Sequence, residues 1–76
     1  IRKEMGNLLK VLLKLKQPKS ILEVGTAVGY SSILMSENMP VDCKIVTIEN
    51  YDKRIPIARN NIKRAGKEDC IQPWRF

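Results

Sequence analysis

The sequence ILEVGTAVGYSS, residues 21–32, places two glycines just after a short apolar run that contains a single acid. Ser20–Val24 is mostly apolar, includes β-branched residues and is bounded by turn residues. Such a run predicts a strand covered on both faces in a parallel sheet. Gly25 permits a sharp turn after this strand, and Gly29 is expected to let a ligand approach the backbone. The stretch therefore predicts a strand that ends in a ligand-binding loop.

The rest of the chain alternates between helical and strand patterns. Apolar residues at three- and four-residue steps predict an amphipathic helix over residues 2–16, which ends at residues 17–19. A second strand with the same pattern as the first is predicted at Lys44–Glu49. Between the two strands, residues 30–38 are expected to form a helix of two to three turns.

A further helix is expected after the second strand. Its apolar stripe consists of Ile55, Ala58, Ile62 and Ala65. If Asp52 is the N-cap, Pro56 is the fourth helical residue and its missing N–H costs only the first intrahelical bond, so the helix begins no earlier than Asp52. Gly66 is expected to end it. The order of helix, strand, helix, strand and helix predicts an α/β fold with a parallel strand pair and a right-handed crossover.

Glu49 stands 20 residues after Gly29, at the end of the second predicted strand. In nucleotide-binding β-α-β units, a carboxylate at this position can accept hydrogen bonds from both ribose hydroxyls. The alternative is a strand-end acid that caps the next helix, although Asn50 or Asp52 could serve as that cap instead. Because doubly wound folds bind ligands at the carboxyl ends of their strands, the glycine loop and Glu49 form one candidate nucleotide site.

Composition narrows the classes of function. A chain of 76 residues is one small domain at most, and it shows neither a signal-peptide pattern nor an apolar run long enough for a membrane span. We expect an excised or truncated cytoplasmic piece. Cys43 and Cys70 are far apart, and the chain has no His and no C-x-x-C, so the sequence suggests neither a zinc site nor a disulfide framework.

The net charge of +6 is distributed unevenly along the chain. Residues 1–19 carry six Lys/Arg against one acid, and residues 51–76 carry seven against three acids. Residues 20–50 have a net charge of −3. The middle of the chain is therefore expected to favour a cationic ligand and the flanks an anionic one, unless the basic flanks are simply solvated helix surfaces.

The glycine spacing distinguishes two classes of cofactor. Dinucleotide sites normally have G-x-G-x-x-G, whereas residues 23–29 have the form E-x-G-x-x-x-G. This form resembles motif I of class I S-adenosylmethionine-dependent methyltransferases. With GYS after the loop, then IVTIE and IARNNIKRAG, residues 5–69 resemble the catechol and caffeoyl-CoA O-methyltransferase family and its bacterial relatives. The resemblance implies a Rossmann-like methyltransferase fold.

The resemblance also implies which residues bind the cofactor. Backbone groups of the loop are expected to line its methionine portion, and Ser31 to bind its carboxylate through the hydroxyl and the N–H. Tyr30 is expected to pack beneath the loop. Glu49 is expected to hold the ribose, and Glu23 to lie near the amino group or to fix the loop. The predicted cofactor-binding residues are Glu23, Gly25, Thr26, Ala27, Gly29, Tyr30, Ser31, Glu49 and Asn50.

The catalytic chemistry is expected to lie outside this chain. In the family, Mg²⁺ binds the acceptor hydroxyl through residues on later strands and loops, so neither catalytic nor metal-binding residues are predicted here. Residues 1–69 are predicted to be the N-terminal cofactor-binding part of the domain. Residues 70–76 are expected to be an atypical tail without the family's third strand, because Pro73 cannot donate to a central ladder. Truncation, a frame change or residues foreign to the natural chain would explain such a tail, and the alternative is a natural divergent end.

The predicted function is transfer of a methyl group from S-adenosylmethionine to a hydroxyl. The acceptor is expected to be a phenolic small molecule or a tRNA hydroxyuridine, and the basic flanks weakly favour the tRNA. Two alternatives stay open: the nicotinamide-binding domain of an oxidoreductase, and a non-enzymatic basic RNA-binding module. A homodimer is expected, because two strands leave an apolar edge open.

Overall fold

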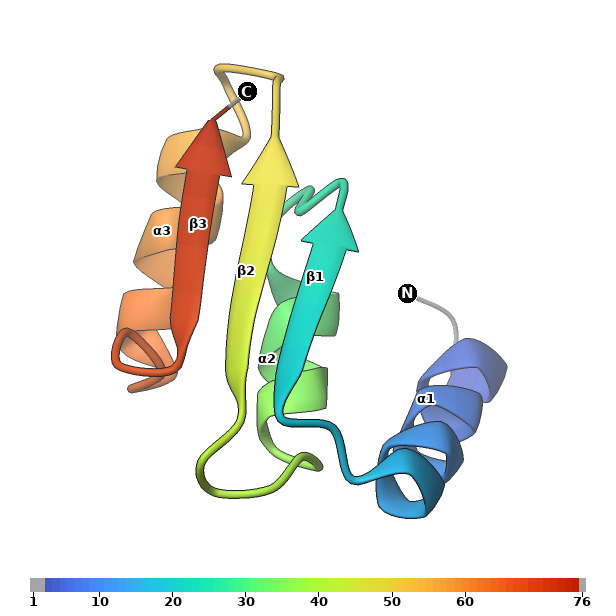
Figure 1. The fold of residues 1–76 in the computed structure, drawn as a ribbon. Coiled ribbons are helices and arrows are strands. Elements are labelled where there is room, and N and C mark those ends of the chain that lie inside the picture. The colour runs from blue at the N-terminus through green and yellow to red at the C-terminus, as the bar shows by residue number, and fades with distance from the viewer. Residues whose placement is uncertain (1–2, 76) are drawn as a thin grey trace.

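The computed structural model describes residues 3–75, which form an α/β fold with three helices and three strands (Figure 1). In chain order these are α1 (Lys3–Lys16), β1 (Ser20–Val24), α2 (Tyr30–Ser36), β2 (Lys44–Glu49), α3 (Ile55–Arg64) and β3 (Ile71–Arg75). The two predicted strands are confirmed at their predicted bounds, and all three predicted helices are present. The prediction that the first helix begins at residue 2 lies outside the described residues.

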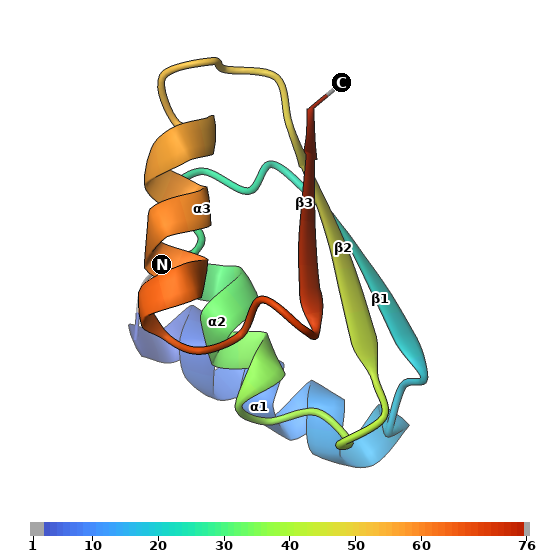
Figure 2. The same cartoon turned by 90° about the vertical axis from the view of Figure 1, so that its left-hand side faces the viewer.

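One parallel sheet contains the strands in the order β1-β2-β3. Ile21 of β1 lies opposite Ile45 of β2, and Ile45 lies opposite Ile71 of β3. Figure 2 shows α2 and α3 on one side of this sheet. The buried core consists of Leu13, Met35, Ile45, Ile62 and Ile71. More buried and less buried side chains alternate along β1 and β2, and the more buried set faces the helices.

The opposite face of the sheet is apolar and uncovered in the described part of the chain. Leu22 and Val24 of β1 are 68% and 69% exposed, and Trp74 of β3 is 58% exposed. These residues lie in two neighbouring rows of the sheet, because Val24 pairs with Ile48 and Ile48 pairs with Trp74. The sequence predicted strands covered on both faces, whereas within residues 3–75 helices cover one face (Figure 2).

The expectation that residues 70–76 lack a strand is wrong, because Ile71–Arg75 pairs with β2 along its length. Parallel pairing explains how Pro73 is accommodated. The Cys70 carbonyl accepts from Ile45 N–H of β2, whereas the Ile71 N–H turns away from β2 and donates to the Lys67 carbonyl. Backbone groups alternate between the two sides of a strand, so Pro73, two residues after Ile71, also points its nitrogen away from β2.

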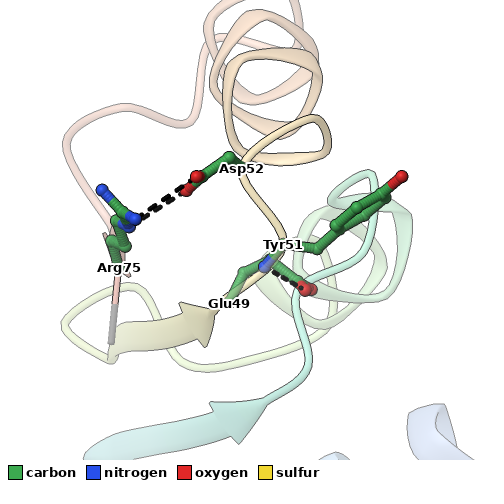
Figure 3. A network of polar contacts seen from close by, with 4 residues as sticks. All are labelled: Glu49, Tyr51, Asp52 and Arg75. Carbon is green, nitrogen blue, oxygen red and sulfur yellow. Dashed lines mark hydrogen bonds and ion pairs between the residues drawn. The ribbon is translucent and has the colours of Figure 1, made fainter.

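The start of α3 differs from the expected N-cap. The helix begins at Ile55, so Pro56 is its second residue, where the absent N–H has no intrahelical partner to lose. Asp52 lies outside the helix and forms an ion pair with Arg75 of β3, 3.0 Å from Arg75 Nε to Asp52 Oδ1 (Figure 3). The predicted end is confirmed, because Gly66 follows the helix with φ 71°.

Helix α1 packs against α2 at a glycine. Gly6 is buried, and a Cβ built on it would lie 3.2 Å from Leu34 Cδ2 of α2. Leu13 of α1 is also buried in the core, and Leu9 packs against it. The other large apolar residues of α1 are exposed: Met5, Leu8, Val11, Leu12 and Leu15. Among the described residues, the helices are too short or too polar to cross a membrane.

Candidate functional site

The glycine loop joins the end of β1 to the start of α2 and lies beside the end of β2. Both Gly25 N–H and Thr26 N–H donate to the Ile48 carbonyl, at 2.8 and 3.2 Å. Gly25, Ala27 and Gly29 have φ of 91°, 51° and 91°, which are left-handed values that L side chains rarely adopt. Three such residues within five positions give the loop its sharp turn, as the sequence predicted for Gly25.

The two loop glycines serve different neighbours. A Cβ on Gly25 would meet nothing within 4 Å, so this position opens to free space. A Cβ on Gly29 would lie 3.5 Å from the Ala58 carbonyl oxygen and 3.6 Å from Ile62 Cγ1, both of α3. The Cβ side of Gly29 therefore faces α3 at van der Waals distance, whereas the Cβ side of Gly25 is open. The expectation that Gly29 lets a ligand approach the backbone stays a prediction.

Glu49 connects the end of β2 to this loop. Its Oε1 accepts a hydrogen bond of 2.7 Å from Ala27 N–H. Its Oε2 accepts one of 3.2 Å from Tyr51 N–H (Figure 3). The residue is 7% exposed. The Ala27 donor first, and then the Tyr51 donor and the charge of Arg54, hold the pKa of the Glu49 carboxyl below its ordinary value against the opposing effect of burial. Glu49 is thus an ionised acceptor beside the loop.

Glu23 of β1 anchors the junction between the loop and α2. Its carboxylate accepts hydrogen bonds from the hydroxyls of Ser31, Ser32 and Thr47, the last at 2.7 Å. Thr26 and Thr47 hydroxyl oxygens lie 2.6 Å apart. Because the Thr47 hydroxyl has one proton and gives it to Glu23, Thr26 is the donor in that pair. Of the two roles expected for Glu23, this geometry provides the fixing of the loop.

The other predicted site residues are placed as follows. Thr26 is buried, with its side chain turned towards Thr47. Tyr30 is 61% exposed, so the expectation that it packs beneath the loop is wrong. The Ser31 hydroxyl is directed to Glu23. Asn50 is exposed directly after β2. The structure therefore brings the loop, Glu23, Ser31 and Glu49 to one end of the sheet and leaves the Tyr30 side chain in solvent.

Three residues of this site did not figure in the sequence prediction: Ser32, Thr47 and Asn61. Thr47 is fully buried, and a signal for it exists, because it alternates with buried Ile45 and Glu49 along β2. Asn61 of α3 donates from Nδ2 to the Val28 carbonyl of the loop at 2.8 Å. The sequence carries no comparable signal for Asn61, because residues adjacent in a helix point in different directions.

Metal-binding groups are absent from the described part of the chain: among residues 3–75, no three His, Cys, Asp or Glu side chains gather to hold an ion. Cys43 and Cys70 are free thiols, and burial raises the pKa of the Cys43 thiol. Two surface pockets, of about 460 and 390 Å³, lie between α3 and β3 and beside the turn before β2, and no predicted cofactor-binding residue lines either.

Comparison with known proteins finds one matching family model and several similar O-methyltransferases. A family model described as O-methyltransferase matches residues 1–74. A catechol O-methyltransferase of Niastella koreensis is 40% identical over 67 residues, which is 88% of this chain and 30% of that relative. An O-methyltransferase of Bacillus cereus, solved in complex with SAH, superposes with a TM-score of 0.91 at 32% identity, over 99% of this chain and 34% of that one.

A second solved structure is TomG, an O-methyltransferase of Streptomyces achromogenes involved in tomaymycin synthesis, in complex with SAM. It superposes with a TM-score of 0.88 at 33% identity, over 99% of this chain and 34% of that protein. The chain thus spans about a third of the length of these relatives. With the parallel sheet and the loop that motif I predicted, these matches show that the chain belongs to the S-adenosylmethionine-dependent O-methyltransferase family.

Proposed function

We propose that the protein that carries this chain binds S-adenosylmethionine at the Gly25–Gly29 loop and transfers its methyl group to a hydroxyl. The observation that carries the proposal is Glu49, whose carboxylate lies at the end of β2 and holds Ala27 of the loop at 2.7 Å. This contact puts an acceptor for ribose hydroxyls beside the loop backbone. Each carboxylate oxygen can accept two hydrogen bonds, so Glu49 keeps capacity for a ligand.

The residues present fit a cationic nucleoside. The position above Gly25 is open, and residues 20–50 have a net charge of −3, which favours a ligand that carries a sulfonium and an ammonium group. The Ser31 hydroxyl gives its one proton to Glu23, so a cofactor carboxylate would bind the Ser31 backbone N–H or compete for that proton. When bound, the cofactor supplies an electrophilic methyl group, and the residues of this chain orient it.

The acceptor and the division of the domain are further parts of the proposal. The name of the Niastella koreensis relative supports a phenolic acceptor. Exposed basic residues of α1 and α3, such as Lys10, Lys14 and Arg59, support the tRNA alternative.

We assign cofactor binding to residues 1–69 together with β3, and we place the ligands for any Mg²⁺ outside residues 3–75. A homodimer and a cytoplasmic location stay predictions.

Calorimetry on the full-length protein tests the cofactor. We expect S-adenosylhomocysteine to bind with one site, and NAD not to bind, because the loop lacks the third glycine of a dinucleotide site. Binding of NAD alone would restore the oxidoreductase alternative, which the relatives do not support. Binding of a tRNA pool without S-adenosylhomocysteine would favour the non-enzymatic RNA-binding module.

Salt dependence tests the acceptor. If tRNA is methylated, activity should fall steeply with added salt, because each neutralised phosphate contributes a counterion-release slope of roughly −0.7 to −0.9. A small phenol should show little such dependence. Flat activity on tRNA from low to moderate salt, or methylation of catechol alone, would contradict the tRNA acceptor.

A further inference from the structure

The glycine loop is held from two sides at consecutive residues. From β2, Glu49 accepts the Ala27 N–H at 2.7 Å. From α3, Asn61 Nδ2 donates to the Val28 carbonyl at 2.8 Å. Ala27 has φ 51°, a left-handed value that costs an L-residue roughly 1–2 kcal/mol. The loop therefore depends on contacts outside itself to keep this shape.

Helix α3 supplies a fitted surface for the same part of the loop. Ala58 and Ile62 are each 1% exposed, and a Cβ on Gly29 would lie 3.5–3.6 Å from them. Asn61 lies between these two residues in sequence and adds the polar contact to Val28. This face of α3 therefore seats the loop by packing at Gly29 and by one directed hydrogen bond at Val28.

We infer that Asn61 is a positioning residue for the cofactor loop. Its amide holds the Val28 carbonyl, and so keeps Ala27 where Glu49 reaches it, without itself lying among the predicted cofactor-binding residues. The chemistry is directional, because an amide NH₂ can donate to a carbonyl whereas an ionised carboxylate cannot. The inference deepens the proposed function and rests on it, since the loop that Asn61 holds is the proposed cofactor site.

The test compares Asn61→Ala and Asn61→Asp with Asn60→Ala in the full-length protein. Asn60 is the matched control, because it is an exposed amide on the same helix and has no hydrogen bond to the loop among the described residues. Loss of one hydrogen bond should weaken S-adenosylhomocysteine binding by roughly threefold to tenfold in calorimetry, while the control changes by less than about twofold. In kinetics, the KM for the cofactor should rise and the KM for the acceptor should not.

Hydrogen exchange in the ligand-free protein gives a readout that does not need the cofactor. We expect the Ala27 and Gly29 amides to exchange faster in both Asn61 variants than in wild type or Asn60→Ala, with core amides such as Ile45 unchanged. A protein that merely lost stability would speed exchange throughout. If Asn61→Ala does not fold, Asn61→Asp keeps the volume and removes the donor, and it carries the test.

Two results separate the two proposals. Wild-type affinity and wild-type exchange at Ala27 in a folded Asn61 variant would overturn the role of Asn61 and leave the cofactor assignment intact. Failure of the wild-type protein to bind S-adenosylhomocysteine would overturn the proposed function. In that case, faster exchange of the loop amides in the variants would still support Asn61 as the residue that holds the loop, and unchanged exchange would overturn it.

Discussion

Ala27 N–H and Glu49 Oε1 are joined by a hydrogen bond of 2.7 Å, although the two residues are 22 positions apart in the sequence. This bond ties the glycine loop after β1 to the end of β2. It also uses the ionised form of Glu49, because a carboxylate is a stronger acceptor than a neutral acid. Protonation of the Glu49 carboxylate should therefore weaken the bond that holds the loop in its shape.

Stability should fall at acid pH through this coupling. The Glu49 carboxyl has its pKa lowered from 4.5 in the folded protein, mainly by the Ala27 N–H. A depressed folded pKa means that the contribution to stability is present above the unfolded pKa and is lost as pH falls through the folded pKa. Urea unfolding of the full-length protein at pH 7 and at several values below 4.5 should show this loss.

Glu49→Gln isolates the contribution of this group to the acid loss. The Gln side-chain oxygen can still accept from Ala27 N–H but does not ionise in this range. The variant should therefore lose less stability between pH 7 and acid pH than wild type, with the other carboxylates common to both. An equal loss in the two proteins would mean that Glu49 is not held ionised by the loop.

The loop glycines should be indispensable for cofactor binding for two different reasons. Gly25→Val strains a residue at φ 91° and fills the open approach, whereas Gly29→Val strains the same φ and pushes against the Ala58 carbonyl. Both variants should abolish S-adenosylhomocysteine binding in calorimetry, and Gly29→Val should also lower the unfolding midpoint more than Gly25→Val does.

Gly66→Ala is the control for backbone strain alone. Gly66 has φ 71° with open space around its Cβ position. It belongs to the connection between α3 and β3, which lies at the opposite end of the sheet from the loop between β1 and α2 (Figure 1). Its substitution should destabilise the protein without changing cofactor affinity. Undiminished affinity in Gly29→Val would remove the loop from the proposed site.

The sequence predicted the elements of this fold because each carries a local signal. Short apolar runs with β-branched residues, bounded by turn residues, predicted β1 and β2, and the glycine spacing predicted the loop between β1 and α2. Pro73 misled the prediction because a proline is compatible with a parallel strand when its nitrogen points away from the partner, and that side is set by register. Register depends on tertiary pairing, which short-range patterns do not contain.

The sequence predicted the glycine loop and Glu49 of the candidate site, but it did not predict several of the residues that contact them. Glu49 and the glycines have fixed spacing in the sequence, so they could be found there. The neighbours of Gly29 could not, because contact with Ala58 depends on how α3 packs on the sheet. For the same reason the hydroxyl partners of Glu23, which come from both α2 and β2, emerged only from the three-dimensional structure.

The hydroxyl of Thr47 should contribute to folding through the Glu23 network. Thr47 is fully buried and bonded both to Glu23 and to Thr26. Thr47→Val keeps the shape but leaves two polar groups short of a partner, which should lower the free energy of unfolding by about 1–3 kcal/mol in urea titrations. Ser36→Ala serves as control, because its hydroxyl bonds a carbonyl of its own helix, Ile33. Equal effects of the two substitutions would contradict a special role for the network.

Residues 1–76 expressed alone should associate rather than remain monomeric. Leu22, Val24 and Trp74 expose most of their side chains on the uncovered face of the sheet, and the core is small. At about 25 cal/mol per Å² of apolar area, covering such a face is a sizeable gain against the net stability of about 5–15 kcal/mol that complete domains have. Sedimentation velocity at low micromolar concentration should therefore show dimers or larger species. Residues 1–76 alone should also not catalyse methyl transfer.

Charge on the sheet face should reverse that association. Leu22→Lys with Val24→Lys places two like charges on the uncovered face, so the double substitution should shift the sedimentation profile towards monomer without changing Ile21 and Ile45 on the covered face. Val41→Lys is the matched control, because Val41 is fully exposed in the turn before β2 and lies off the sheet face. If the wild-type chain is monomeric, unfolds cooperatively and binds the cofactor, the covered face alone stabilises the fold. If the wild-type chain and the double variant associate equally, the contact lies elsewhere, such as at the outer edge of β1.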